Sequence, residues 1–413
     1  MKKKIHDRGF LKAISAITLV IGMAGLPCTS RAASEETAPP FDTWLSELQA
    51  EAVSRGFDAA IVSSALAGVS PIERVIELDR RQPEFTLTFR KYLDGAISEK
   101  RVKRGRELLV EHKVLLDQVA TKYGVQPRFL IAFWGLETNF GGYFGAFPVA
   151  GSLVTLAHDR RRAKFFREQL LAALDIMSRG DMPIDVKGSW AGAMGNFQFI
   201  PTTYRDFAID FDGDGKRDLW NNMKDGFGSA ANYLSRSGWD RNGTWGREIR
   251  LPDGFDFALA GLDRNRTLAE WQALGVRRAD GRDLPEADIE GAIVIPSGHK
   301  GPSFMVYTNF HTILKWNRSI FYAIAIGHLA DRIIGQGGLL TPPPVSDVPM
   351  SRADVKEMQT RLTSSGFDTG GSDGVIGRMT RDAIRSFQKS VGLPPDAYPS
   401  MDILKRLRGS VEN

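Results

Sequence analysis

Cysteine is almost absent from this chain of 413 residues, since Cys28 is the only one. A single thiol excludes an intramolecular disulfide framework and any metal site built from several cysteine ligands. Cys28 follows Leu26 and Pro27 rather than a small residue, so we do not expect it to carry a lipid anchor. We expect the segment that contains it to be removed, which would leave a mature chain without cysteine.

Long apolar runs are also missing, apart from one near the N-terminus that extends from about Ala13 to Leu26. This run is short for a membrane span. It follows a charged segment with three consecutive lysines, and Ser30 and Ala32 supply the small residues of a cleavage site. This arrangement is typical of a secretory signal peptide. We therefore predict a signal peptide over residues 1–32 and a periplasmic protein.

An excess of positive charge disappears once this segment is set aside. Six of the 54 lysines and arginines lie within residues 1–32, together with one of the 49 acidic residues. The remaining chain has 48 residues of each sign, so the sequence pI of about 9.2 comes from the targeting segment. Binding to nucleic acid needs a basic face on the mature protein. We accordingly predict no nucleic-acid partner.

The rest of the chain divides by composition into a long helical region and a short one. Residues 33–42 are polar and contain proline, and we expect a disordered lead-in there. Apolar residues then recur at helical spacing over a domain that we place at 43–336. The predicted helices cover 106–125, 127–137, 163–180, 225–239 and 311–333. Between about 245 and 305 the pattern changes to short β-like runs, which predicts a small strand-bearing insertion.

A proline-rich segment, residues 337–350, forms the clearest boundary and suits an extended, semi-rigid spacer between domains. A compact unit of about sixty residues follows, which we place at 351–409. The fold class predicted for the whole chain is mainly α.

In the segment "FWGLETNFGG", Glu137 ends a run of bulky apolar residues and precedes a turn. The helix before it is apolar on nearly every side, which is typical of a helix buried on most faces. Burial disfavours the charged form of a carboxylate, and a general acid must hold its proton near neutral pH. The alternative is a structural glutamate at a helix end, bonded to a nearby amide or arginine.

The segment "KGSWAGAMGNFQFIPTTY" (residues 187–204) alternates small residues with large apolar ones. Glycines allow a ligand to approach the backbone closely. Ser189 and Gln198 add neutral hydrogen-bonding groups, which suit a sugar with hydroxyl and acetamido groups. Close packing against another helix would explain the same composition, and composition alone leaves both readings open.

The segment "DFDGDGKRDLW" has the D-x-D-x-D-G pattern of a calcium loop. Alternate positions of such a loop point oxygens inward, and Gly215 permits the sharp turn. The predicted ligands are the side chains of Asp210, Asp212 and Asp214 and the carbonyl of Lys216. An acidic turn without metal is the alternative, but three carboxylates so close together repel one another without a cation.

The run Arg160–Arg162 allows two readings. The first is a solvated helix start. The second is a contact with acidic groups of a substrate.

"GLETNFG" and "GSWAGAMGNFQFIPTTY", followed in order by the acidic loop and "GSAANYL", closely resemble the lytic murein transglycosylase B family. The resemblance covers roughly residues 41–336. It implies a lysozyme-like helical catalytic domain. It also implies cleavage of the β-1,4 bond between N-acetylmuramic acid and N-acetylglucosamine in peptidoglycan, with a 1,6-anhydromuramoyl product.

The resemblance also assigns roles to residues. Glu137 falls on the catalytic residue, which acts first as acid and then as base. Substrate-binding positions of the family fall on Ser189, Gln198, Tyr233 and Asn317. Trp316 stands where the family has tyrosine, so that contact is not carried over. Asn221 replaces the last glutamate of the ordinary calcium loop, and the family implies a later acid, for which Asp225 is the candidate.

The C-terminal unit resembles the peptidoglycan-binding type 1 domain through Asp373-Gly374, Gly377, Thr380, Phe387-Gln388 and Gly392-Leu393. That family is a small three-helix bundle. The core positions predicted from the spacing are Val355, Met358, Leu362, Ile384, Phe387, Ile403, Leu404 and Leu407. The stretch "PDAYPSMDIL" departs from the repeated pattern, so we assign no ligand contacts to single residues.

The combined prediction is an exported lytic transglycosylase that binds peptidoglycan glycan strands, acts as a monomer and needs no catalytic cofactor. A calcium ion would be structural, and other cell-wall enzymes could be partners. Three rivals stay open: a hydrolytic muramidase, which needs a second carboxylate, a non-catalytic peptidoglycan-binding scaffold, and a calcium-controlled binding protein.

Overall fold

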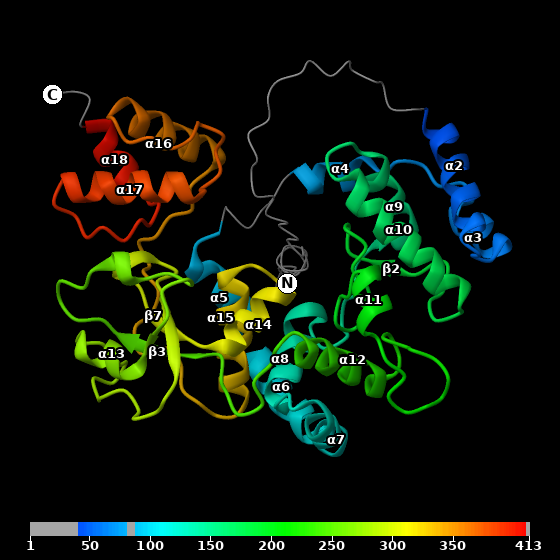
Figure 1. Ribbon diagram of the computed structural model, residues 1–413, viewed down its shortest axis with the longest axis horizontal. Coiled ribbons are helices and arrows are strands. Elements are labelled where there is room, and N and C mark those ends of the chain that lie inside the picture. Colours follow the sequence, from blue (N-terminus) through cyan, green and yellow to red (C-terminus); the bar gives the residue numbers. More distant parts are fainter. Residues whose placement is uncertain (1–39, 81–86, 410–413) are drawn as a thin grey trace, which may run out of the picture. The chain divides into compact units, whose positions relative to one another are not determined.

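The computed structural model describes residues 40–80 and 87–409. The expected signal peptide and most of the expected lead-in lie outside the described residues. The described chain is mainly helical, with one five-stranded sheet and one two-stranded pair (Figure 1). It divides into two compact units, one with the residues before 83 and Arg104–Ser237, the other with those of Pro83–Lys103 and Gly238–Asn413.

Within the described ranges, we find no helix with both the length and the apolar character that a membrane crossing requires.

The first unit is built from helices and one short strand pair. Strand β1 (Phe147–Pro148) runs antiparallel to β2 (Lys187–Gly188). The helices are α2 (Phe41–Ser54), α3 (Ala59–Leu66), α4 (Glu73–Arg80), α7 (Lys113–Tyr123), α8 (Pro127–Thr138), α9 (Val149–His158), α10 (Ala163–Ser178), α11 (Pro201–Phe207) and α12 (Met223–Arg236). Helices α9 and α10 pack against each other along their length (Figure 1).

Helix α8 is buried within this unit and packs against α7 and α12. Pro127 begins it, as predicted, because the φ of proline is already set for a first helical residue. Ten of its twelve residues are buried, which confirms that it is covered on almost every face. The helix ends at Asn139, which is left-handed with φ 51°, and Phe140 follows with φ 61°.

Two predicted helices are each broken in two. The helix expected over 106–125 is α6 (Glu99–Glu111) and α7, separated at His112. The His112 ring contacts the buried rings of Trp134 and Phe227, with centroids 5.7 and 5.6 Å away. This long-range contact favours the break, which the local periodicity of the sequence does not predict.

The helix expected over 311–333 is α14 (Thr308–Trp316) and α15 (Ile320–Ile333). Asn317 is extended, and its Oδ1 accepts a hydrogen bond from the Ser319 amide at 3.0 Å. Ser319 then caps α15 by accepting from the Tyr322 amide. Side chains of this kind compete with helical hydrogen bonds, which explains the interruption.

The second unit contains the predicted strand-bearing insertion. Its antiparallel sheet has the order β4 (Arg266–Thr267), β6 (Glu290–Val294), β7 (Ser303–Val306), β3 (Gly246–Arg250) and β5 (Arg277–Arg278). Helix α13 (Leu268–Ala273) covers it, and the Trp271 indole donates to the Gly291 carbonyl at 2.8 Å. The same unit holds α5 (Phe89–Ala96) and the short 3-10 helices η2 (Phe257–Leu259) and η3 (Gly298–Lys300).

Helices α16 (Arg352–Ser364), α17 (Arg378–Ser390) and α18 (Met401–Gly409) form the C-terminal bundle, drawn in orange and red in Figure 1. All eight predicted core positions are buried in it together, which confirms the predicted helix faces. The proline-rich segment before the bundle is hydrogen-bonded to its surroundings. Glu248 of β3 accepts the amides of Leu340 and Thr341, both at 2.7 Å, and Arg90 donates to the Pro343 carbonyl.

Candidate active site

Glu137 lies in the last turn of α8 and is only 4% exposed. The turn after it is fixed by Thr138. The Thr138 hydroxyl accepts the Gly141 amide at 3.0 Å and donates to the Asn196 carbonyl at 2.9 Å. The end of the glutamate's helix is therefore bonded directly to the glycine-rich segment.

Asn196, which was not predicted from the sequence, joins three parts of the first unit. Its Oδ1 accepts the Trp134 indole N–H at 2.7 Å, while its Nδ2 donates to the carbonyls of Leu219 and Trp220 at 3.0 and 2.7 Å. It thereby links α8, the glycine-rich segment and the end of the acidic loop. An asparagine beside glycines is common in turns, so the sequence held no signal for this role.

Gln198 is held in an unusual state. Its φ is 48°, a conformation that L-residues rarely adopt, and it is 3% exposed. Its Nε2 donates to the carbonyls of Phe144 and Gly195, both at 3.1 Å. Within the described part of the chain its Oε1 is buried without a hydrogen-bond partner. A strained residue with an unused acceptor is typical of a binding site.

Ser189 is buried, and its Oγ accepts the amides of Ala191 and Ala193 at 3.2 and 2.9 Å. The hydroxyl thus shapes the turn that carries the glycines. A contact between Ser189 and a sugar stays a prediction.

Tyr233 and Asn317 belong to different units. The Tyr233 ring, on α12, packs against Phe207 and Phe199 with centroids 4.8 and 6.1 Å away. Burial raises the pKa of its phenol, which keeps it a neutral hydrogen-bond donor. Tyr233 shares the first unit with Glu137, whereas Asn317 follows α14 in the second unit. Their contacts with substrate stay predictions.

The glycines of residues 187–204 serve close packing within the protein. A Cβ added to Gly188 would lie 2.3 Å from the Ala193 carbonyl oxygen, and one on Gly192 would lie 2.5 Å from Leu153. A Cβ added to Gly195 would lie 3.0 Å from the Leu219 Cβ. Packing against another helix therefore holds for Gly192, because Leu153 belongs to α9, whereas the atoms nearest to Gly188 and Gly195 belong to non-helical segments.

The acidic loop brings four carboxylates together. Asp210, Asp212, Asp214 and Asp225 each place one carboxylate oxygen within 4.8 Å of the others. Asp210 is oriented by the amides of Gly213 and Gly215, at 2.7 and 2.8 Å. The arrangement fits a hard cation that prefers oxygen ligands.

Asp225 reaches this cluster from α12 and is fully buried. Its two oxygens accept the amides of Phe211 and Asp218 at 2.7 and 2.9 Å. Burial raises the pKa of Asp225, and the charges of Asp212 and Asp210 raise it further. A bound cation would relieve both effects. The Lys216 amide donates to Asp214 at 2.9 Å, and its carbonyl as a ligand stays a prediction.

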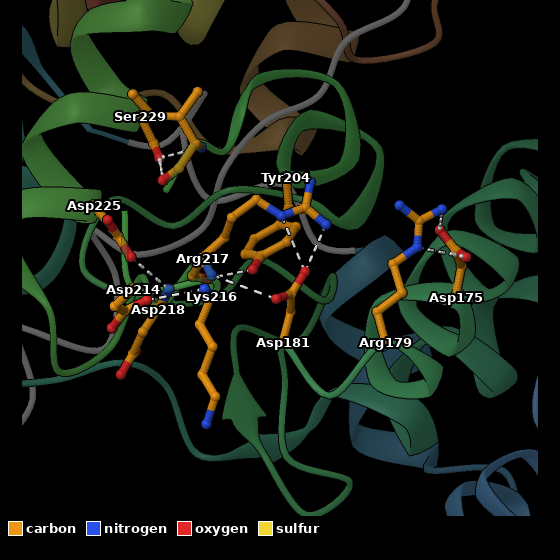
Figure 2. A network of polar contacts seen from close by, with 11 residues as sticks. Asp175, Arg179, Asp181, Tyr204, Asp214, Lys216, Arg217, Asp218, Asp225 and Ser229 are labelled. Carbon is orange, nitrogen blue, oxygen red and sulfur yellow. Dashed lines mark hydrogen bonds and ion pairs between the residues drawn. The ribbon is translucent and has the colours of Figure 1, made fainter. Parts of the chain in front are cut away.

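Arg217 anchors the far end of the loop, and this role was not predicted from the sequence either. Figure 2 shows it between Asp181 and Tyr204. Its Nε and Nη2 donate to Asp181 at 3.0 and 2.5 Å, its guanidinium lies over the Tyr204 ring, and its carbonyl accepts the Tyr204 hydroxyl.

The run Arg160–Arg162 fits neither of its two readings in full. Arg161 and Arg162 both form ion pairs with Asp79 of α4, which is 3% exposed. These arginines therefore connect α4 to the start of α10.

A mainly helical unit with a buried glutamate at the end of α8 and a loop of four carboxylates fits an enzyme of the lytic transglycosylase class. A family model described as the transglycosylase SLT domain matches residues 40–331, and one for a peptidoglycan binding domain matches 351–407. The chain belongs to the transglycosylase SLT family.

Three relatives support this assignment. Membrane-bound lytic murein transglycosylase B of Escherichia coli (strain K12) is 29% identical over 302 residues, which are 67% of this chain and 79% of that protein. SltB3 from Pseudomonas aeruginosa, solved in complex with NAG-anhNAM-pentapeptide, is 45% identical with a TM-score of 0.86, over 90% of this chain and 100% of that chain. Escherichia coli Slt35, solved in complex with calcium, is 26% identical with a TM-score of 0.61, over 70% of this chain and 92% of that chain.

Proposed function

We propose that this protein cleaves the β-1,4 bond between N-acetylmuramic acid and N-acetylglucosamine in peptidoglycan and leaves a 1,6-anhydromuramoyl end. The observation that carries the proposal is the buried Glu137 at the end of α8, where Asn196 bonds the helix to the glycine-rich segment. The relative SltB3 was solved with an anhydro sugar of this kind, which supports the same product.

The reaction needs one carboxyl group used twice. Glu137 donates its proton to the glycosidic oxygen as the bond from C1 to that oxygen breaks. The acetamido group of the substrate stabilises the charge at C1, as in substrate-assisted glycosidases. The Glu137 carboxylate then accepts the proton of the muramic acid C6 hydroxyl, whose oxygen bonds to C1. This restores the acid and consumes no water, and the attacking group has the high effective concentration of an intramolecular nucleophile.

Neutral groups hold the sugar in this proposal. Gln198 offers its unused buried Oε1 to a hydroxyl or amide donor of the substrate. Tyr233 supplies a neutral phenol, while Ser189 and Asn317 complete the set that the family resemblance implies. Removing any of them should weaken substrate binding more than it lowers the turnover of bound substrate.

Calcium has a structural place in this proposal. Asp210, Asp212, Asp214 and Asp225 would hold the ion with the Lys216 carbonyl, and the ion would neutralise their charge. Asp225 and Asn196 both contact the loop, so a rigid loop supports the segment that carries Gln198. We further propose that the protein acts in the periplasm as a monomer, and that its C-terminal bundle binds the same polymer.

The test is product analysis on purified peptidoglycan. Wild type should release anhydromuramoyl products, and Glu137→Gln should lower the rate about a thousandfold, since general acid–base catalysis contributes roughly 10²–10⁴. Glu286→Gln, an exposed glutamate, is the matched control and should leave the rate unchanged.

Mass spectrometry separates the rivals. Products heavier by one water would indicate a muramidase. An unchanged rate for Glu137→Gln would remove Glu137 from the mechanism, and a wild type without lytic activity would favour the scaffold.

A further inference from the structure

The second unit contains a cavity of about 480 Å³ between the sheet-bearing insertion and the C-terminal bundle. We call it the seam pocket. Three separate segments line it: the η3 loop before β7, the stretch from Pro344 to Val348, and α17 to α18 with the turn between them. Two family models match on either side of this seam, over 40–331 and 351–407.

Hydrogen bonds across the seam fix its walls. The His299 amide and Nδ1 both bond to Asp396 Oδ2, at 2.8 and 2.6 Å, and Asp396 also accepts Gln388 Nε2. Gly298, with φ 65°, lies so close that an added Cβ would be 2.6 Å from Asp396 Oδ2. The walls are therefore held in place without a ligand, as in most small-molecule sites.

One buried polar group in this pocket is unused. Ser297 is 4% exposed, and no hydrogen-bond partner for its Oγ occurs among residues 40–80 and 87–409. Burying a hydroxyl without a partner is unfavourable, so such groups in native proteins call for an explanation. A ligand that bonds to Ser297 would supply one.

The charges of the pocket have both signs. Lys405 and Arg406 on α18 lie on its wall with Asp347 and Asp402. Lys300 pairs with Asp402 at 3.1 Å, and the Tyr398 hydroxyl donates to Asp347 at 2.6 Å. A purely anionic or purely cationic ligand would meet repulsion here. A ligand that carries carboxylate and amine groups would be matched.

Apart from two further serines, Ser346 and Ser400, the remaining lining is aliphatic: Pro344, Val348, Leu393, Met401 and Ile403. Val348 is 56% exposed, so apolar surface is available to a ligand. Tyr398 and His299 are the aromatic members of this lining, and each is engaged by a carboxylate. Short aliphatic side chains therefore fit the pocket better than the flat face of a sugar.

We propose that the seam pocket binds the peptide stem of peptidoglycan, a short aliphatic peptide with free carboxylate and amine groups. The proposal rests on the proposed function, because it names a second part of the same polymer. It also assigns recognition of the peptide to the insertion and the bundle together.

The test uses the full chain and the free pentapeptide stem as probe, with binding measured by isothermal titration calorimetry. Ser297→Ala and Lys405→Gln should each weaken binding about tenfold, the effect of losing one good polar contact. Lys389→Gln, an exposed lysine of α17 outside the pocket, is the matched control and should bind as wild type does.

Ser297→Ala also separates a ligand contact from a structural role. It removes a buried hydroxyl that has no partner within the described ranges, so its thermal midpoint should equal or exceed that of wild type. Weaker binding together with a lower midpoint would contradict the assignment. So would pentapeptide binding unchanged in both pocket variants, no binding to wild type at millimolar peptide, or displacement of the peptide by peptide-free NAG-anhNAM.

The two proposals can fail separately. If wild type forms anhydro ends on peptide-free glycan and both pocket variants bind the peptide normally, only the proposal for the seam pocket is overturned. Wild type that binds the peptide through this pocket but forms no anhydro ends would overturn the catalytic proposal alone.

Discussion

Gly145 lies where two backbone segments of the first unit touch. Its φ is 113°, and an added Cβ would lie 1.9 Å from the Gly188 carbonyl oxygen, next to the β1–β2 pair. Gly145→Ala should therefore lower the free energy of unfolding by about 3 kcal/mol, from overpacking and backbone strain. Urea denaturation measures this change.

Gly180→Ala is the matched control, because Gly180 has φ 77° and nothing within 4 Å of its added Cβ. It should lose only the strain, about 1 kcal/mol. Equal losses in the two variants would show that the contact with Gly188 is unimportant.

The importance of Glu137 could be predicted from the sequence, whereas that of Asn196 could not. Glu137 is the one charged residue at the end of an apolar run, so the sequence itself isolates it. Asn196 acts through Trp134, Leu219 and Trp220, which are up to 62 residues away along the chain. No local pattern encodes those partners.

At the scale of elements, Asp79 connects α4 to the start of α10. It is 3% exposed and bonds to Arg161 Nε at 2.9 Å and to Arg162. Asp79→Asn would remove the charge of the buried carboxylate with which both guanidinium groups pair, and breaking a pair of this kind costs about 3 kcal/mol. Chemical denaturation should show this loss.

Glu77→Gln is the control for Asp79, since Glu77 pairs with Arg74 on the surface at 52% and 56% exposure. Its effect should stay within about 0.5 kcal/mol. Similar losses for both variants would argue against a special role for the buried pair.

The acidic loop is the second element that can be tested. Calcium at a hundred times its dissociation constant should stabilise the protein by about 2.7 kcal/mol, and a chelator should remove that gain. Differential scanning calorimetry measures both. Asp225→Asn should abolish most of the calcium response, whereas the exposed Asp253→Asn should keep it. A thermal midpoint of wild type that does not change when calcium is added would indicate an acidic turn without metal.

At the scale of the whole chain, the contact between the insertion and the bundle should make the stability of the folded state depend on pH through Asp396. Burial alone would raise the pKa of Asp396, but hydrogen bonds from His299, Tyr398 and Gln388 outweigh it, so the pKa is lowered from 3.8. A lowered pKa stabilises the folded state above the unfolded value, and this contribution is lost as the pH falls through the folded value.

Asp396→Asn should therefore be less stable than wild type at pH 6, by about 2 kcal/mol for hydrogen bonds to a charged group. The difference should shrink as the pH falls below about 3.8. Thermal midpoints between pH 3 and 6 test this, with the exposed Asp382→Asn as control. A difference that is independent of pH would contradict the charge-based explanation.

Features that depend on neighbours along the chain could be predicted from the sequence. Helical spacing predicted the C-terminal core, and the apolar character of residues 127–137 predicted the buried α8. Short β-like runs predicted the strand-bearing insertion, and the motifs in their order identified the family. Each of these signals is local, because a helix or strand is specified by the spacing of its own apolar residues.

Tertiary structure alone decided what depends on distant partners. The helix break at His112 depends on Trp134 and Phe227, and the packing role of Gly192 depends on Leu153. The seam pocket exists only because Ser297 and Lys405, which are far apart along the chain, are brought together in the second unit. Such contacts form when long-range packing outweighs local preference, so the spacing of residues along the chain does not predict them.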